Sequence, residues 1–249
     1  MTELLPPEYA TRFGAVEEQV RAACLDAHRP RSEVSIVGVT KEQPAESIGA
    51  WRAWCEARGE VPHVGESYVQ ELRAKAPLLG RAVVHYIGRL QRNKVLDAVR
   101  FASIIESVHS AELAEAIDAA AARLAVRPVI LLQVNISGDE QKAGFSPAGI
   151  SAQAVALARR LGHVEIGGVM TITRYYEDRE KVRPDFERLA ALAHEVKGAL
   201  RHEGVSSGKR FEISMGMSQD FDLAIKAGAT LVRIGTALFG ERPARTRGA

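Results

Sequence analysis

Residues 35–44 read S-I-V-G-V-T-K-E-Q-P, a short apolar run that stops at a lysine. Ile36, Val37 and Val39 are typical of a strand buried on both faces. Pro44 cannot continue a strand ladder, so the strand ends before it. Lys41 therefore lies where a buried strand reaches the surface. If this is the first strand of a parallel barrel, its carboxyl end opens onto the face where such barrels place their chemistry, and an amine there can meet a carbonyl compound.

Strand-like and helix-like segments alternate along the rest of the chain. Short apolar runs predict strands at residues 35–39, 61–64, 82–87, 103–106, 129–135, 164–171, 211–214 and 231–234. Apolar residues three or four apart predict helices at residues 9–27, 45–58, 68–76, 95–99, 110–124, 146–161 and 185–202, with a last one beginning at Ser218. We expect Ser110, Ser146 and Ser218 to be helix N-caps. Eight strand–helix units favour one α/β domain over residues 1–249, a (β/α)8 TIM barrel with an extra N-terminal helix.

Composition narrows the class of protein. Hydrophobic residues make up 46% of the 249 residues and no apolar run approaches the ~18 needed to span a membrane, so we expect no membrane partner. The start of the chain lacks the layout of a secretory signal, and two cysteines make no disulfide framework, so we expect a cytoplasmic protein. A net charge of +2 without a basic stripe gives no reason to expect nucleic acid. The terminal residues 242–249 are expected to be frayed.

Polar and glycine residues follow the end of each expected strand. Only eight of the 33 basic residues are lysines, which makes the lysine after the first strand more informative. Because the carboxyl ends of parallel strands share one face of a barrel, these residues are expected to lie together. They are Lys41, Glu66, Ser67, residues 89–93, Ser107, Asn135, Thr171, residues 214–218, Gly235 and Thr236.

The two last strands are followed by S-M-G-M-S at residues 214–218 and by G-T within R-I-G-T at residues 233–236. The loops at these positions form the usual phosphate site of such barrels. Ser214, Ser218 and Thr236 offer hydroxyls, the glycines let backbone N–H groups approach, and a helix beginning at Ser218 would point its N-terminus inward. The alternative is that Ser218 is only an N-cap and the glycines only turns.

A phosphate site facing a lysine indicates two chemistries. One is a Schiff-base aldolase acting on a sugar phosphate, and the other is pyridoxal 5′-phosphate (PLP) held as a Schiff base. Arg233, if it points inward from the eighth strand, can donate to the pyridine nitrogen of PLP, which favours the cofactor. Its alternative role is an ion pair at the strand end.

Six ordered motifs resemble the pyridoxal phosphate homeostasis protein family, the PLP-binding relatives of the alanine racemase amino-terminal barrel. The resemblance spans nearly the whole chain. The motifs are V-G-V-T-K-E-Q-P at 37–44, V-G-E-S-Y-V-Q-E at 64–71, H-Y-I-G-R-L-Q-R-N-K at 85–94, Q-V-N-I-S-G-D-E-Q-K-A-G at 133–144, S-M-G-M-S-Q-D at 214–220 and V-R-I-G-T-A-L-F-G at 232–240.

The resemblance implies PLP in Schiff-base linkage to Lys41, phosphate held by the loops at 214–217 and 235–236, and a ring near Ser67 and residues 85–91. It departs from the family at Thr40, where serine is commoner, and at Ser67, where asparagine is usual, which weakens any specific ring contact from that loop. No metal site is expected. The expected cofactor-binding residues are Lys41, Ser67, His85, Asn135, Met170, Ser214, Met215, Gly216, Met217, Arg233, Gly235 and Thr236.

The same resemblance implies a PLP carrier that buffers or delivers the cofactor in vitamin B6 and amino-acid homeostasis, with no established reaction. We expect a monomer whose partners are PLP and PLP-dependent apoenzymes. The alternative is a PLP-dependent amino-acid racemase or lyase. An arginine at the pyridine nitrogen makes the ring a poorer electron sink. Larger alanine racemases draw a tyrosine base from a second domain, which is not expected here, and tyrosines 68, 86, 175 and 176 are expected to be structural or exposed.

Lys142 follows the fifth strand and is expected on the same face as Lys41. We predict that it captures PLP transiently during transfer. The alternative is a solvated charge beside Asp139 and Glu140.

Overall fold

Eight parallel strands close into a barrel in the order in which they occur along the chain. This computed structural model describes residues 5–139, 141–205 and 210–242. The barrel closes where Ser35 pairs with Leu231 and Gly38 with Ile234. The strands are β1 Ser35–Val39, β2 His63–Glu66, β3 Val83–Tyr86, β4 Ile104–Val108, β5 Val129–Gln133, β6 Glu165–Met170, β7 Glu212–Ser214 and β8 Leu231–Ile234.

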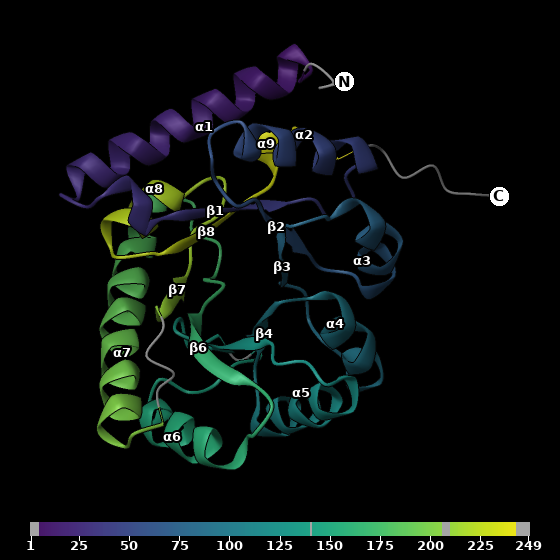
Figure 1. Cartoon of the computed structure of the whole chain (residues 1–249). Coiled ribbons are helices and arrows are strands. Elements are labelled where there is room, and N and C mark those ends of the chain that lie inside the picture. Colours follow the sequence, from purple (N-terminus) through teal and green to yellow (C-terminus); the bar gives the residue numbers. More distant parts are fainter. Residues whose placement is uncertain (1–4, 140, 206–209, 243–249) are drawn as a thin grey trace.

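Helices follow the strands and form a ring around the barrel, as Figure 1 shows in a view into it. Four short 3-10 segments lie in the connections: η1 Arg31–Glu33, η2 Ala76–Leu78, η3 Arg92–Lys94 and η4 Arg179–Val182. The α-helices are α1 Pro7–Asp26, α2 Ala45–Glu56, α3 Val69–Lys75, α4 Val95–Phe101, α5 Ala111–Leu124, α6 Ile150–Arg160, α7 Arg183–His202, α8 Phe221–Lys226 and α9 Thr236–Phe239.

The expected barrel, with its extra N-terminal helix α1, is confirmed, and all eight expected strands are present. Ser110 is the N-cap of α5, where its side chain accepts a hydrogen bond from Leu113 N. Two other cap predictions are wrong. Helix α6 begins at Ile150 after Gly149, whose φ of 79° favours glycine, and Ser146 Oγ accepts only from Ala148 N. Helix α8 begins at Phe221, after Asp220 rather than Ser218.

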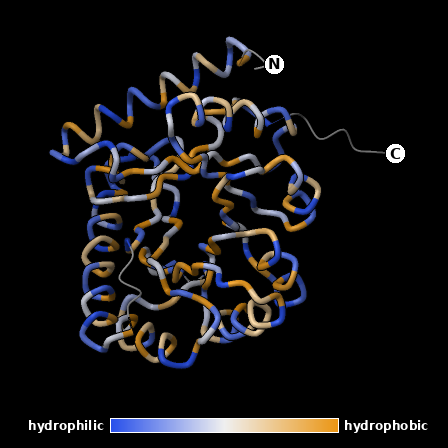
Figure 2. Tube along the Cα trace, in the orientation of Figure 1, coloured by the Kyte–Doolittle hydropathy of each residue, from blue (hydrophilic) through white to orange (hydrophobic). Residues whose placement is uncertain are grey.

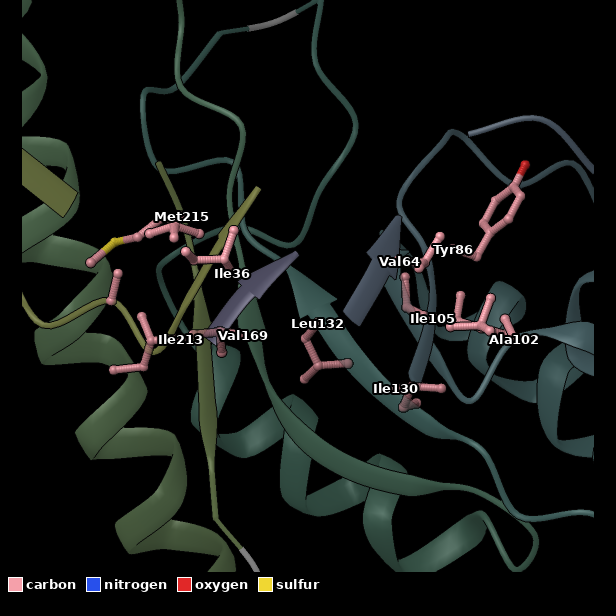
Figure 3. Close-up of a cluster of buried hydrophobic side chains, with 14 of the residues drawn as sticks. Ile36, Val64, Tyr86, Ala102, Ile105, Ile130, Leu132, Val169, Ile213 and Met215 are labelled. Atoms are coloured by element: carbon pink, nitrogen blue, oxygen red, sulfur yellow. The ribbon is translucent and has the colours of Figure 1, made fainter. Parts of the chain in front are cut away.

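The main core lies between the strands and the helices. Figure 3 shows part of it, with Ile130 and Leu132 of β5, Val169 of β6 and Ile213 of β7 among the buried side chains. Hydrophobic and hydrophilic residues both recur in successive turns of α1 and α7 (Figure 2), as expected for helices with one face on the barrel. A separate small cluster of Val37, Leu131, Met170 and Leu231 is also buried. By strand alternation these side chains fill the barrel interior, which is therefore packed.

Helix α1 is the element outside the alternation, and it lies beside α2, α8 and α9 (Figure 1). Phe13 stands at the centre of its contact surface, with its ring centroid 5.2 Å from that of Trp51 and 5.8 Å from those of Trp54 and Phe239. Tyr9 stacks on the same ring at 5.5 Å. Because α2 follows β1 and α9 follows β8, α1 covers the place where the barrel closes.

Cys24 and Cys55 are both buried and unpaired. Among the described residues, no helix is long and apolar enough to cross a membrane. Residues 243–249 of the expected frayed tail, and Glu140 beside Lys142, lie outside the described residues.

Candidate functional site

Two adjoining cavities open at the carboxyl ends of the strands. The first, of about 370 Å³, lies between the loops after β6, β7 and β8, and Lys41 is in its wall. The second, of about 460 Å³, lies beside α3 and the loop after β3, and Lys41 also lines it. Ser67, Ile87 and Ile172 are shared by both cavities as well. Lys41 is therefore accessible from two sides.

Lys41 lies two residues after the end of β1 and is half-buried. Burial lowers the pKa of its amine, and the positive charges of Arg242 and Arg233 lower it further. A lowered pKa increases the fraction of neutral amine, the form that attacks a carbonyl carbon. Glu42 has a φ of 58°, a conformation rare outside glycine, so the chain turns sharply immediately after Lys41.

A buried ionic cluster fixes this turn to β2 and α3. Lys75 Nζ donates to the carbonyl oxygen of Thr40 at 2.6 Å and to the carboxylates of Glu66 and Glu71, each at 2.9 Å. Thr40 Oγ1 donates to Glu66 Oε1 at 2.6 Å, and Glu66 Oε2 is buried without a hydrogen-bond partner among the described residues. Burial raises the pKa of Glu66 against the opposing effects of Thr40 and Lys75. The cluster orients Lys41 through its neighbour Thr40.

A second buried network crosses the barrel interior below the first cavity. Arg233 Nη1 donates to Ser214 Oγ at 2.6 Å, and Ser214 Oγ donates to Glu106 Oε2 at 2.5 Å. The other carboxylate oxygen of Glu106 is 2.6 Å from His85 Nδ1, and His85 Nε2 is 2.8 Å from His63 Nδ1. Burial lowers the pKa of His63 to about 3, so its ring is neutral. The chain of contacts runs from the amino end of β2 to the cavity.

The charges of this network are balanced by one carboxylate. Burial would raise the pKa of Glu106, but the hydrogen bond and charge of His85 and the charge of Arg233, together with the hydrogen bond of Ser214, lower it overall. Arg233 Nη1 is 3.7 Å from Glu106 Oε2, and its Nη2 donates to Thr171 O at 2.8 Å. Glu106 therefore holds the Arg233 guanidinium in place at the cavity floor.

The loops after β7 and β8 meet at the first cavity. Ser218 Oγ accepts from Gly235 N at 3.3 Å and from Ala237 N at 3.4 Å. These distances are longer than usual, so both N–H groups remain available to a stronger acceptor. Gly216 has a φ of 87°, and a Cβ there would come within 2.5 Å of the Ala224 Cβ, so the loop requires glycine.

Positive charge dominates the first cavity. Its lining includes the cations Lys41, Arg174, Arg179, Arg233 and Arg242 against a single carboxylate, Asp220. Arg179 pairs with Asp222 and Arg242 with Glu42, so part of this charge is compensated locally. An anionic group with several acceptor oxygens fits this wall.

The structure brings half of the expected cofactor-binding residues to the first cavity. These are Lys41, Ser67, Met217, Arg233, Gly235 and Thr236. Arg233 points inward as expected, and it also takes part in the alternative role, an ion pair. The other six do not line either cavity: His85, Asn135, Met170, Ser214, Met215 and Gly216.

Ser214 was expected to offer an exposed loop hydroxyl, and that premise is wrong. It is the last residue of β7, its side chain is fully buried, and its hydroxyl is occupied by Arg233 and Glu106. Ser218 was expected to cap α8, and instead its hydroxyl lies at the start of α9. The strand ends at Ser214 as expected, so the first correction concerns only the direction of that side chain, whereas α8 begins two residues later than expected.

The remaining expected residues are packed in the core or shape a loop. Met170 is fully buried inside the barrel, and Met215 is fully buried in the outer core (Figure 3). Asn135 Nδ2 donates to Asp139 O at 2.8 Å and to Lys142 O at 3.2 Å, which shapes the loop after β5. Lys142 Nζ donates to Thr173 O at 2.7 Å, at the edge of the first cavity.

Sequence reasoning missed Glu106, His63 and Lys75. Two of them, Glu106 and Lys75, left a signal in the sequence. Glu106 stands inside the apolar run I-I-E-S-V, where a charged residue on a buried strand requires a partner. Lys75 is one of only eight lysines, at the end of the short helix that begins within the second motif.

The comparisons with known proteins agree with this architecture. Residues 13–243 match the alanine racemase N-terminal domain family. The chain is 36% identical over 237 residues to the pyridoxal phosphate homeostasis protein of Aquifex aeolicus, covering 93% of this chain and 97% of that protein. The chain belongs to the pyridoxal phosphate homeostasis protein family. The human member of this family is 34% identical over 244 residues, covering 92% of this chain and 84% of that protein.

Solved structures of related proteins superpose on this fold. PipY of Synechococcus elongatus PCC7942 with PLP bound superposes with a TM-score of 0.73 at 34% identity, covering 90% of this chain and 100% of that chain. An alanine racemase of Clostridium difficile 630 reaches a TM-score of 0.60 at 15% identity and covers 92% of this chain and 58% of that chain, which shows a shared fold alone. The expected family and its alanine racemase-like barrel are both confirmed.

Proposed function

We propose that this chain binds PLP at the mouth of the barrel, with Lys41 as the amine that holds its aldehyde, and buffers or delivers it in vitamin B6 homeostasis. One observation carries the proposal: a half-buried amine of lowered pKa lines a cavity whose other walls hold four arginines and Gly235, whose N–H makes only a long hydrogen bond of 3.3 Å to Ser218. Relatives named for PLP homeostasis, and a PLP-bound relative of known structure, support it.

Each part of the cavity has a distinct task in this proposal. The N–H groups of Gly235 and Ala237, with the hydroxyls of Ser218 and Thr236, bind the phosphate. Arg233 donates to the ring nitrogen and, held by Glu106, keeps its own charge there. When bound, the cofactor supplies an aldehyde that condenses with a primary amine. The Lys75 cluster orients Lys41 towards it.

The chain is proposed to carry PLP rather than to turn over an amino acid. Neither tyrosine that lines the first cavity is placed as a base. Tyr176 donates its hydroxyl to Asp185 at 2.7 Å, and Tyr175 is 80% exposed. An arginine, not a carboxylate, faces the region assigned to the ring nitrogen, which disfavours carbanion chemistry. We expect the protein to act as a monomer in the cytoplasm and to pass PLP to dependent apoenzymes.

The test is to incubate the purified protein with PLP, reduce it with borohydride and map the pyridoxyl mass by peptide mass spectrometry. We expect a yellow protein before reduction and the label on Lys41. Lys41→Ala should lose the colour, and the matched variant Lys197→Ala, on the far part of α7, should keep it. A protein that stays colourless with excess PLP would favour a cofactor-free aldolase, and a label found only on other lysines would refute the role of Lys41.

Turnover of an amino acid would distinguish a racemase or lyase from a PLP carrier. The loaded protein is incubated with single amino acids, and loss of optical purity and release of keto acid are followed. We expect neither above the rate of free PLP. Turnover that disappears in Lys41→Ala would contradict the carrier proposal.

We propose that Lys142 is a second amine that holds PLP transiently while the cofactor is transferred. Its Nζ donates to Thr173 O beside the first cavity and is 3.8 Å from Asp139 Oδ2. We expect Lys142→Ala to load Lys41 normally but to transfer PLP more slowly to a vitamin B6-dependent apoenzyme. Transfer is measured as recovery of the apoenzyme's activity, and equal rates in both proteins would leave Lys142 as a loop charge.

A further inference from the structure

The second cavity has no task in the proposed function. Its volume is about 460 Å³, and it lies on the other side of Lys41. Its walls come from α3, the end of β3 and the segment that leads into α4. A cavity of this size beside a reactive amine accommodates a second small molecule.

The charge of this cavity selects an anion. Its lining contains the cations Lys41, Arg89 and Lys94 and no aspartate or glutamate. Lys94 is half-buried, and neither it nor Arg89 forms an ion pair with any residue that the structure describes. A cleft lined by one sign of charge attracts the opposite charge, and partial burial of Lys94 strengthens this attraction because it limits screening.

A hydroxyl in the wall of the second cavity fits the same ligand. Tyr86 is 3% exposed and lines the second cavity, yet its hydroxyl has no hydrogen-bond partner among the described residues. Figure 3 shows the hydroxyl at the end of the ring farthest from Ala102 and Ile105. Burial raises the pKa of Tyr86 to about 12, so the phenol stays protonated and donates. The hydroxyl is not among the buried unpaired polar atoms of the described residues, so it is reached from the cavity and is free to donate to a ligand there.

The wall that carries these donors is rigid. A Cβ on Gly88 would come within 2.1 Å of the backbone oxygen of Ser67, so the segment after β3 lies directly on the loop after β2. Ser107 Oγ donates to Gly88 O and ties the same segment to β4. The cavity is therefore formed before any ligand enters it, which lowers the entropic cost of binding.

We propose that the second cavity binds the carboxylate of a free amino acid, with Lys94 and the Tyr86 hydroxyl as its donors and Arg89 at its rim. A carboxylate accepts from both an ammonium and a hydroxyl, and an amino acid held this way has its amine one carbon from the carboxylate, on the side of Lys41. This inference deepens the proposed function and rests on it for its chemical consequence. The bound amino acid releases Lys41 from the cofactor.

That release is a simple exchange. With the cofactor bound, the incoming amine nitrogen would form a carbon–nitrogen bond to the carbon that Lys41 holds, the bond to the Lys41 nitrogen would break, and protons would pass from the incoming amine to the Lys41 amine. Atoms and electrons balance without an oxidant or a reductant. Unloading of the carrier would then respond to the amino-acid supply.

The first experiment needs no cofactor. The full chain, labelled with 15N, is titrated with L-alanine, with ethylamine as a probe that lacks the carboxylate, and with inorganic phosphate. We expect L-alanine to shift the backbone signals of Ile87, Gly88 and Arg89, and ethylamine to leave them unchanged. Inorganic phosphate should act at Gly235 and Thr236. Lys94→Met should weaken alanine binding by about tenfold or more, the worth of one hydrogen bond to a charged group. Lys197→Met, an equal charge change on α7, should not.

Alanine shifts that are absent, or equal in Lys94→Met, would overturn the assignment. So would phosphate binding at Gly88 in preference to alanine. The conservative variant Tyr86→Phe removes only the hydroxyl and keeps the ring in the core, so it tests the same site if Lys94→Met does not fold. We expect it to weaken alanine binding several-fold.

The second experiment uses the loaded protein and follows the absorption of the cofactor as an added amine displaces Lys41. We expect alanine to act faster than ethylamine, and Lys94→Met to shrink that ratio by about tenfold while loading the same amount of cofactor. A variant that no longer retains the cofactor would show that Lys94 binds the cofactor itself, and would overturn the inference. If the unaltered protein takes up no cofactor, the proposed function fails, and the titration without cofactor still decides whether the carboxylate site exists.

Discussion

Lys41 derives its reactivity from its surroundings. Burial lowers the pKa of its amine, and Arg242 is the next largest cause, so removing that charge should raise the pKa. We expect Arg242→Gln to move the pH profile of condensation with pyridoxal, which lacks the phosphate, to higher pH. The neutral amine then forms only at higher pH, so the rate at neutral pH falls. The measurement is the initial rate of the absorption change across pH. As a control, Arg188→Gln at an exposed position of α7 should leave the pH profile unchanged. An unchanged profile in Arg242→Gln would refute the charge of Arg242 as a cause of the lowered pKa of Lys41.

Glu106 is the single carboxylate of the interior network. Glu106→Gln leaves Arg233 buried without its counter-charge, so we expect a loss of about 3–5 kcal/mol in the free energy of unfolding, measured with denaturant. The double variant Glu106→Gln/Arg233→Gln should lose less than the two single losses added together, since the uncompensated charge is gone. Glu115→Gln, in a surface pair with Arg160, should cost within about 1 kcal/mol.

The pH dependence of this effect has a definite sign. The pKa of Glu106 is lowered in the folded protein, so its contribution is present above the pKa of the unfolded state and is lost as pH falls through the folded pKa. The stability difference between the unaltered protein and Glu106→Gln should therefore shrink on acidification. A constant difference down to strongly acidic pH would contradict a paired carboxylate at this position.

At the scale of elements, the end of β7 and the start of α9 have different tasks. Thr236 is exposed in the first cavity, so Thr236→Ala should weaken PLP affinity by about tenfold and leave unfolding unchanged. Ser214 is buried between Arg233 and Glu106, so Ser214→Ala should lower the free energy of unfolding more than it lowers PLP affinity. PLP titration and denaturant unfolding on both variants separate the two effects. Thr11→Ala on exposed α1 is the matched control, and an unchanged affinity in Thr236→Ala would move the phosphate elsewhere.

At the scale of the whole molecule, α1 joins the first and last units of the barrel. Phe13 is 1% exposed among four aromatic rings, so Phe13→Ala should cost about 3–5 kcal/mol of unfolding free energy. Leu25 is on the same helix but 75% exposed, and Leu25→Ala should cost at most about 0.5 kcal/mol. We expect one cooperative transition, as for a single domain. Two separate transitions, or equal small losses in both variants, would contradict α1 as part of the barrel domain.

The sequence by itself determined the barrel, because hydrophobic periodicity is local: eight apolar runs separated by amphipathic segments leave few other ways to bury those surfaces. It also placed Lys41, Thr236 and Gly235 on one face, since the carboxyl ends of parallel strands share an edge.

The tertiary structure decided which polar residues reach that face. Ser214 and Ser218 are four residues apart, yet one is buried beside Glu106 and the other lies in the cavity. Glu106, Ser214 and Arg233 meet across the barrel from β4, β7 and β8, and no local pattern encodes a contact between residues more than a hundred positions apart. The same holds for the second cavity, where Tyr86 and Lys94 line one space with Lys41 only because the barrel closes around them.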